Sequence, residues 1–100
     1  MPQTRFEWDE SKNEANQRKH GVRFEQAVLA FGDPGVVSYK DRFEGSEERW
    51  KTLGIVEDLL FLLLVAHTVD NQDPEEEVIR IISARQATRA ERRLYEEENS

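Results

Sequence analysis

Residues 78–95 constrain the fold most, because a short apolar strand pattern runs directly into an arginine-rich helix pattern. A Thr-x-x-Glu capping box, formed by Thr88 and Glu91, predicts that the helix begins at Thr88. The residues before it have the β-branched density of a buried strand: Val78, Ile79, Ile81 and Ile82. The segment also contains five arginines. They are therefore expected at, and beyond, one end of a strand.

Three of these arginines share one face of the predicted helix, because Arg89, Arg92 and Arg93 follow the i, i+3, i+4 spacing. A guanidinium group matches a phosphate that it contacts through two hydrogen bonds. This face therefore favours a nucleic-acid ligand. The alternative is a solvated helix face on which Arg89 and Arg92 pair with Glu96.

Length and composition predict one cytoplasmic domain over residues 1–100. Cysteine is absent, which excludes disulfides and thiolate metal sites and is typical of a reducing compartment. The apolar run at residues 59–66 is too short to span a bilayer, so no membrane association is expected. No glycine motif for a phosphate or dinucleotide and no metal-ligand spacing is present, so we expect neither cofactor nor metal.

The net charge of −7 does not exclude a basic binding pocket, because the acids gather in two segments. One is the expected loop at residues 70–77, and the other is the tail at residues 96–100. Both segments lack apolar anchors and repel themselves, so we expect the loop to be mobile and the tail to be frayed. An acidic surface also suits a basic protein partner.

The first half of the chain predicts one short strand and two helices. Residues 6–8 alternate as a strand does, and a capping box at Ser11 and Glu14 predicts a helix that runs to about His20 and ends at Gly21. A second helix is predicted from apolar residues at i, i+3, i+4 and i+7, namely Phe24, Ala27, Val28 and Phe31. Residues 33–35 are expected to end it.

The second half predicts four strands and the capped helix. Strand patterns cover residues 36–39, 49–56, 59–69 and 78–84, with the second and third joined at hairpin spacing by residues 57–58. The element order is therefore β-α-α-β-β-β-β-α. We predict an α+β domain in which two N-terminal helices and one C-terminal helix pack on one antiparallel β-sheet.

Six sequence blocks carry a resemblance to a known family: Phe6-Glu7-Trp8-Asp9; Asn16-x-x-Lys19-His20-Gly21-Val22-x-Phe24-Glu25-x-Ala27; Asp33-Pro34; Glu48-Arg49-Trp50 with Leu53-Gly54; Ile79 to Arg85; and Ala87-Thr88-x-x-Glu91-Arg92-x-x-Tyr95. In this order and at these spacings, they resemble the BrnT toxin family across nearly the whole chain. The resemblance implies the toxin of a bacterial type II toxin–antitoxin pair, a small ribonuclease with a RelE-like fold. It also implies a BrnA-type antitoxin partner. Operator DNA is then expected to be contacted by the antitoxin and not by this chain. The chain departs from the pattern in its long acidic turn at residues 70–77.

Metal-free cleavage of RNA requires three tasks: deprotonation of a 2′-hydroxyl, stabilisation of charge on the phosphorus, and protonation of the 5′-oxygen. Arg49, Arg85 and Lys19 belong to three separate blocks and are expected to converge on one catalytic pocket. For Arg49, the alternative is a salt bridge with Glu47 or Glu48. For Arg80, burial against a carboxylate is favoured over catalysis.

Acid, base and RNA-stacking candidates are fewer. His20 is a catalytic candidate, although a cation at a helix C-terminus also stabilises the helix dipole. His67 ends an apolar strand and is expected to be a satisfied core residue. Candidate RNA or phosphate contacts come from a tryptophan able to stack on a base and from the last helix: Trp50, Arg89, Arg92 and Tyr95. For Trp50 and Tyr95, the alternative is that the aromatic ring packs in the core. The alternative function is a non-catalytic binding module that acts with a DNA-binding partner as a transcriptional co-regulator.

Overall fold

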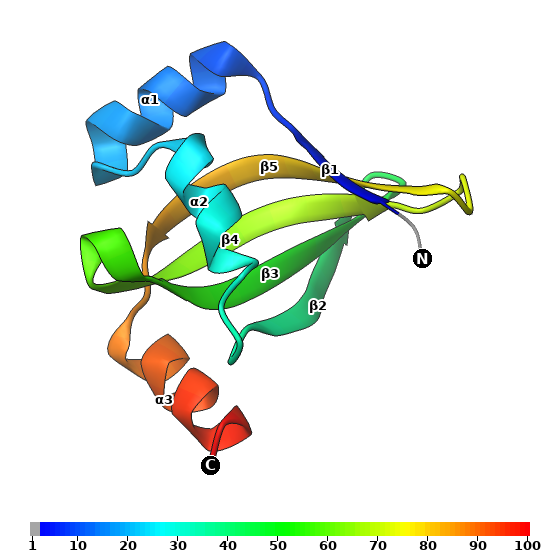
Figure 1. The fold of residues 1–100 in the computed structure, drawn as a ribbon. Coiled ribbons are helices and arrows are strands. Elements are labelled where there is room, and N and C mark those ends of the chain that lie inside the picture. The colour runs from blue at the N-terminus through cyan, green and yellow to red at the C-terminus, as the bar shows by residue number, and fades with distance from the viewer. Residues whose placement is uncertain (1–2) are drawn as a thin grey trace.

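The predicted layout of strands and helices is confirmed. The computed structural model describes residues 3–100 as an α+β fold (Figure 1). In chain order, the elements are β1 (Gln3–Glu7), α1 (Glu10–His20), α2 (Phe24–Ala30), β2 (Val37–Glu44), β3 (Glu47–Val56), a short 3-10 helix (Glu57–Leu59), β4 (Phe61–Asp70), β5 (Glu76–Gln86) and α3 (Arg89–Glu98).

The five strands form one sheet in the order β1-β5-β4-β3-β2. Strands β2 to β5 are antiparallel neighbours, as predicted, but β1 pairs in parallel with β5. The sheet is therefore mixed rather than wholly antiparallel. The reason is topological: α1 and α2 carry the chain from β1 at one edge to β2 at the other, and three antiparallel steps then bring β5 back beside β1.

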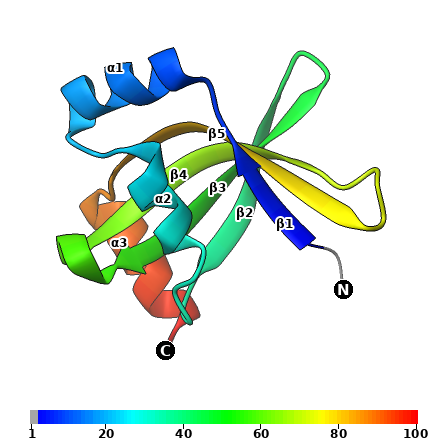
Figure 2. The ribbon, with the colours of Figure 1, turned by 45° about the horizontal axis from the view of Figure 1, so that its top comes forward.

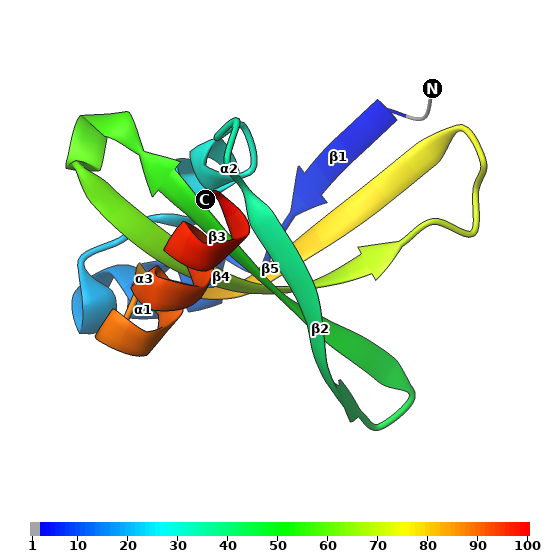
Figure 3. The ribbon, with the colours of Figure 1, turned by 90° about the horizontal axis from the view of Figure 1, so that it is seen from below.

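The helices lie in two layers on opposite faces of the sheet. Figures 2 and 3 show α1 and α2 on one face and α3 on the other. The larger apolar cluster lies under α2 and includes Phe24, Leu63 and Val65, all fully buried. A smaller cluster lies under α3, where Leu53, Leu62 and Leu64 pack against Leu94 and Tyr95. Only part of the second face is thus used for core packing.

Helix α1 begins two residues earlier than the Ser11 capping box predicts. Asp9 is the N-cap, and its Oδ1 accepts hydrogen bonds from the backbone N of Ser11 at 2.8 Å and of Lys12 at 3.2 Å. An aspartate in this position satisfies N–H groups that the first helical turn leaves free. The predicted end is confirmed: Gly21 has a φ of 71°, in the left-handed region that glycine tolerates best.

Asparagines, rather than an apolar stripe, dock α1 onto the sheet. Its buried residues are Asn13 and Asn16. The Asn16 amide donates to the backbone oxygens of Val22 at 2.9 Å and Ala84 at 2.8 Å, and its Oδ1 accepts from the N of Ala84 at 3.1 Å. Buried amides fully paired in this way avoid the cost of an unsatisfied polar group. The helix is therefore fixed against β5 by a two-way bond to one residue.

Two connections differ from the sequence prediction. Residues 40–44 and 47–48 extend the β2–β3 hairpin, where a loop is expected between shorter strands. The predicted two-residue turn at residues 57–58 is instead the 3-10 helix, followed by Leu60 with a φ of 57°. At the C-terminus, α3 runs through Glu98, and the Asn99 side chain donates to the Gly35 oxygen at 2.9 Å. These contacts oppose fraying of the tail.

Candidate active site

Strand register places Arg85 on the face of the sheet that carries α3. Side chains of directly opposed residues point to the same face of a sheet. Leu53 pairs with Leu64, and Leu64 pairs with Arg85. Both leucines pack against Leu94 of α3. Arg85 therefore points to the same side as that helix.

Three further cations share this orientation. Lys51 and Arg49 lie two and four residues before Leu53 in β3. Because side chains alternate along a strand, both point to the same face as Leu53. Arg80 pairs with Thr68, which has the same orientation in β4. We call the four residues the basic cluster: Arg49, Lys51, Arg80 and Arg85. Because α3 packs only over the leucines at one end of this face, the cluster extends beyond the helix.

Arg49 is the member of the basic cluster that carries a buried donor without a partner among the described residues. Its Nε is buried and has no hydrogen-bond partner within residues 3–100. Its Nη2 lies 3.9 Å from Glu47 Oε1, a contact too long for a hydrogen bond. A buried N–H of a guanidinium group without an acceptor is costly. The predicted salt bridge with Glu47 is therefore present as a long contact, and Arg49 keeps donors that can bind an anionic ligand.

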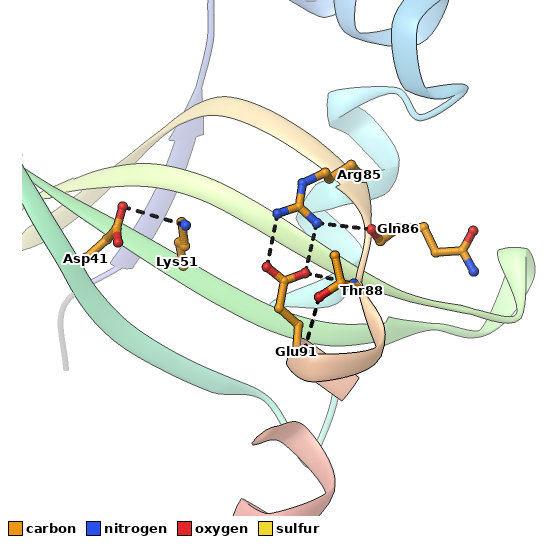
Figure 4. Close-up of polar contacts among 6 residues, drawn as sticks. All are labelled: Asp41, Lys51, Arg85, Gln86, Thr88 and Glu91. Carbon is orange, nitrogen blue, oxygen red and sulfur yellow. Dashed lines mark hydrogen bonds and ion pairs between the residues drawn. The ribbon is translucent and has the colours of Figure 1, made fainter. Parts of the chain in front are cut away.

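Arg85 is held in one orientation by Glu91 of α3 (Figure 4). Its Nη1 and Nη2 donate to the two carboxylate oxygens at 2.8 and 3.0 Å, a bidentate pair. Glu91 also accepts from the Thr88 backbone N at 2.8 Å, so the predicted capping box is present. The hydrogen bonds from Arg85 lower the pKa of Glu91 from 4.5 to about 2, against the opposing effect of burial. The carboxylate therefore stays ionised at neutral pH.

Tyr39 and Lys51 lie on the same face as Arg85 and Arg49. They pair in the register of β2 and β3. Burial raises the pKa of the Tyr39 hydroxyl, and the negative charges of Glu91 and Asp41 raise it further. Lys51 Nζ lies 3.7 Å from Asp41 Oδ2, an ion pair also drawn in Figure 4. Tyr39 thus keeps its proton at neutral pH beside a cation.

Sequence reasoning missed Lys51, although its signal was present. In a strand, residues i and i+2 share a face, so any argument for Arg49 extends to Lys51. The burial of Arg80 against a carboxylate was also predicted, and this prediction is wrong. Arg80 is exposed, since at its place in β5 the side chain points to the part of the face that α3 does not cover.

Lys19 and His20 do not join the basic cluster. Both are exposed in the last turn of α1, within the helix layer on the opposite face of the sheet. Trp50 also points to that opposite face, because it neighbours Arg49 in β3 and pairs with the buried His67. Lys40 Nζ lies 5.6 Å from the centre of its ring. Arg49 and Arg85 therefore share one face of the sheet, whereas Lys19 lies in the helix layer on the other face.

The remaining candidates lie on α3 and in the core. Arg89 and Arg92 are exposed on α3. The Tyr95 hydroxyl donates to Asp33 Oδ2 at 2.6 Å, and its burial and this bond raise its pKa to about 12. His67 is a satisfied core residue, as predicted: Nε2 lies 2.7 Å from the Thr52 hydroxyl, and burial lowers its pKa.

A comparison with family models identifies the family of this chain. The model for the ribonuclease toxin BrnT of a type II toxin–antitoxin system matches residues 8–91. The chain belongs to this family. No curated protein matches it. The BrnT match contains the whole basic cluster together with Tyr39 and Glu91. The resemblance inferred from the six sequence blocks is thereby confirmed, with the ribonuclease activity and the antitoxin partner that define such a toxin.

Metal sites and membrane-spanning helices are two further features to consider. Within residues 3–100, no group of three His, Cys, Asp or Glu side chains is placed to hold a metal ion. In the same part of the chain, no helix is both long and apolar enough to cross a membrane. Side chains suited to phosphate are gathered in the basic cluster, and further arginines are exposed on α3. Preorganised cations in the basic cluster could stabilise charge that develops on a phosphorus.

Proposed function

We propose that this chain is a metal-independent endoribonuclease that cleaves RNA at the basic cluster and so inhibits translation and growth in the cytoplasm. The observation that carries the proposal is the buried Arg49 Nε without an acceptor, beside Lys51 on the open part of the face. The Arg49 side chain is 24% exposed, and a turn of its guanidinium group would bring this N–H to a bound phosphate oxygen. The RelE-like fold that the resemblance implies, with catalysis on one sheet face, is part of this proposal.

The cluster suits attack by a 2′-hydroxyl on the adjacent phosphate. In this reaction, the 2′-oxygen bonds to phosphorus as it loses its proton, and the 5′-oxygen leaves and gains one. Arg49 and Lys51 would bind the phosphate oxygens, and Arg85, oriented by Glu91, would add a third cation. One well-placed donor of this kind contributes on the order of a hundredfold in rate.

Tyr39 is the candidate proton donor to the leaving 5′-oxygen. Its pKa is raised by burial and by two nearby carboxylates, so the hydroxyl stays protonated at neutral pH. It lies beside Lys51 in register. His20 and Tyr95 are weaker candidates, since His20 lies in the opposite layer and the Tyr95 hydroxyl is bound to Asp33. Arg89 and Arg92, both exposed on α3, are candidates for phosphates that flank the cleaved bond.

The partner in this proposal is a BrnA-type antitoxin that carries the DNA-binding domain. The net charge of −7 supports a basic partner that is attracted by long-range electrostatics. Operator DNA would be contacted only through the antitoxin, because the net charge of −7 opposes direct binding of this chain to DNA phosphates. Growth would resume when the antitoxin binds.

The test compares wild-type protein with Arg49→Ala, measuring RNA cleavage in EDTA and growth on expression without antitoxin. We expect wild type to cleave RNA in EDTA, and Arg49→Ala to lose at least a hundredfold in rate while its melting temperature is kept. Arg18→Ala, an exposed cation of α1 in the other layer, is the matched control and should stay active. Cleavage that requires a divalent metal, or full activity of Arg49→Ala, would contradict the proposal. A growth-neutral chain that binds only a DNA-binding partner would favour the co-regulator alternative.

A further inference from the structure

Large apolar side chains are exposed together where β3 passes into β4. The exposed fractions are 38% for Ile55, 86% for Leu60 and 41% for Phe61, with Leu29 of α2 at 52%. We call these four residues the β3–β4 patch. Scattered exposed apolar residues are ordinary in soluble proteins, but four gathered at one end of a sheet indicate an interaction surface.

Two hollows flank the patch and share a wall. One, of about 500 Å³, lies between the end of α2 and β3 and includes Leu29, Ile55 and Glu57 in its lining. The other, of about 440 Å³, lies toward α3, and its lining includes Ile55, Glu57, Leu60, Phe61 and one cation, Arg92 of α3. Because both hollows include Ile55 and Glu57 in their lining, they lie side by side around this end of the sheet, and we call the pair the groove.

Leu60 is an unusual residue for its position. Its φ of 57° lies in the left-handed region, where glycine or asparagine is favoured over a branched side chain. It is also the most exposed of the large apolar residues, so its side chain gains little from burial. In the free protein, Leu60 has both a backbone cost and a solvation cost. A local cost of this kind points to a use outside the isolated chain.

We propose that this groove binds an amphipathic segment of the antitoxin, with at least two large apolar side chains flanked by lysine or arginine. The apolar side chains would fill the two hollows on either side of Ile55. The flanking cations would meet Glu57 and Asp58, two exposed acids on the 3-10 helix. This complementarity favours a basic antitoxin segment over a second copy of this acidic chain. The inference rests on the proposed function only in taking the antitoxin as the partner.

The groove is separate from the basic cluster. Ile55 lies six positions after Arg49 in β3, a span of about 20 Å at the rise of an extended strand. No member of the basic cluster lines either hollow, and of the candidate phosphate contacts only Arg92 does so, in the second hollow. Substitutions of Leu60 and Ile55 leave Arg92 and the basic cluster in place. Loss of antitoxin binding and loss of RNA cleavage can accordingly be separated by substitution.

The test is Leu60→Asn, which removes the apolar side chain and suits the left-handed backbone. We expect its melting temperature to equal or exceed that of wild type, and its RNA cleavage to be unchanged. Its Kd for the purified antitoxin encoded beside this chain should rise at least tenfold, so that antitoxin no longer rescues growth at equal expression. Phe43→Asn is the matched control, an exposed aromatic in β2 outside the patch, and should bind antitoxin as wild type does. Ile55→Thr, which keeps a β-branched strand residue, is the second patch variant and should also weaken binding.

Unchanged affinity in folded Leu60→Asn and Ile55→Thr would overturn the inference. So would self-association of wild type that both variants abolish while antitoxin affinity stays the same, since the groove would then bind a second copy. A wild-type chain that fails to cleave RNA, yet loses antitoxin affinity on Leu60→Asn, would refute the proposed function and leave this inference standing.

Discussion

Glu91→Gln tests whether one carboxylate both begins α3 and orients Arg85. Glutamine keeps the length of the side chain and can complete a capping box, so the change removes mainly the charge. The structure gives Glu91 two short hydrogen bonds from Arg85 and one from the Thr88 backbone N. We therefore expect the substitution to weaken the attachment of α3 to the sheet without removing the helix.

The size of the effect follows from the pKa of Glu91, which is lowered from 4.5 to about 2. One pKa unit corresponds to about 1.4 kcal/mol, so the full shift would be worth roughly 3 kcal/mol. The Arg85 side chain is 34% exposed, and solvent screens the pair in part. A loss of about 1–2 kcal/mol in the free energy of unfolding at pH 7 is the expected result.

The pH dependence gives the sharper measurement. Because the folded-state pKa of Glu91 lies below the unfolded value, its contribution is fully present above about pH 4.5 and is lost as the pH falls toward 2. Urea denaturation at pH 7 should separate Glu91→Gln from wild type, and the difference should shrink by pH 3. Glu96→Gln, an exposed glutamate on the same helix, is the control and should differ little at either pH. An equal difference at both pH values would refute the ion-pair reasoning.

Three further predictions concern other parts of the chain. Lys19→Ala should cleave RNA at the wild-type rate, because Lys19 lies in the opposite helix layer; a large loss of rate would return it to the site. Gly54→Ala should lower the free energy of unfolding by about 3 kcal/mol, measured by denaturation, since an added Cβ would lie 2.1 Å from the Ala30 backbone oxygen. Tyr95→Phe should cost about 1.5 kcal/mol through loss of the bond to Asp33 and leave RNA cleavage intact.

Local sequence signals predicted the elements that depend on neighbouring residues. The Thr88–Glu91 capping box, the left-handed Gly21 and the apolar face of α2 all involve contacts within about four positions along the chain. Where two such signals overlapped, the prediction failed: Asp9 and Ser11 are both good N-caps, and Asp9 takes the role because its carboxylate accepts from two backbone N–H groups. Helix propensity alone does not rank the two.

Long-range pairing was beyond local reasoning. The parallel pairing of β1 with β5 joins segments about seventy positions apart, and β1 has too few buried residues to signal its neighbour. The docking of α1 depends on Asn16 bonding to Ala84, which no apolar periodicity reveals. For the site, the arginine blocks predicted that Arg49, Arg85 and Lys19 converge on one pocket, and the structure places Arg49 and Arg85 on one face of the sheet. The failure of Lys19 to join them follows from the layer in which α1 lies.

The two faces of the sheet differ in how completely their polar groups are satisfied, and this difference separates stability from function. Under α1 and α2, the buried Asn16 and His67 have partners within the chain. On the α3 face, Arg85 has a full partner in Glu91, whereas the buried Arg49 Nε has none. The Arg85–Glu91 pair thus fixes the helix beside the cluster, and Arg49 remains for the substrate. If this division is correct, substitutions of Glu91 should act first on stability, and substitutions of Arg49 should act first on RNA cleavage.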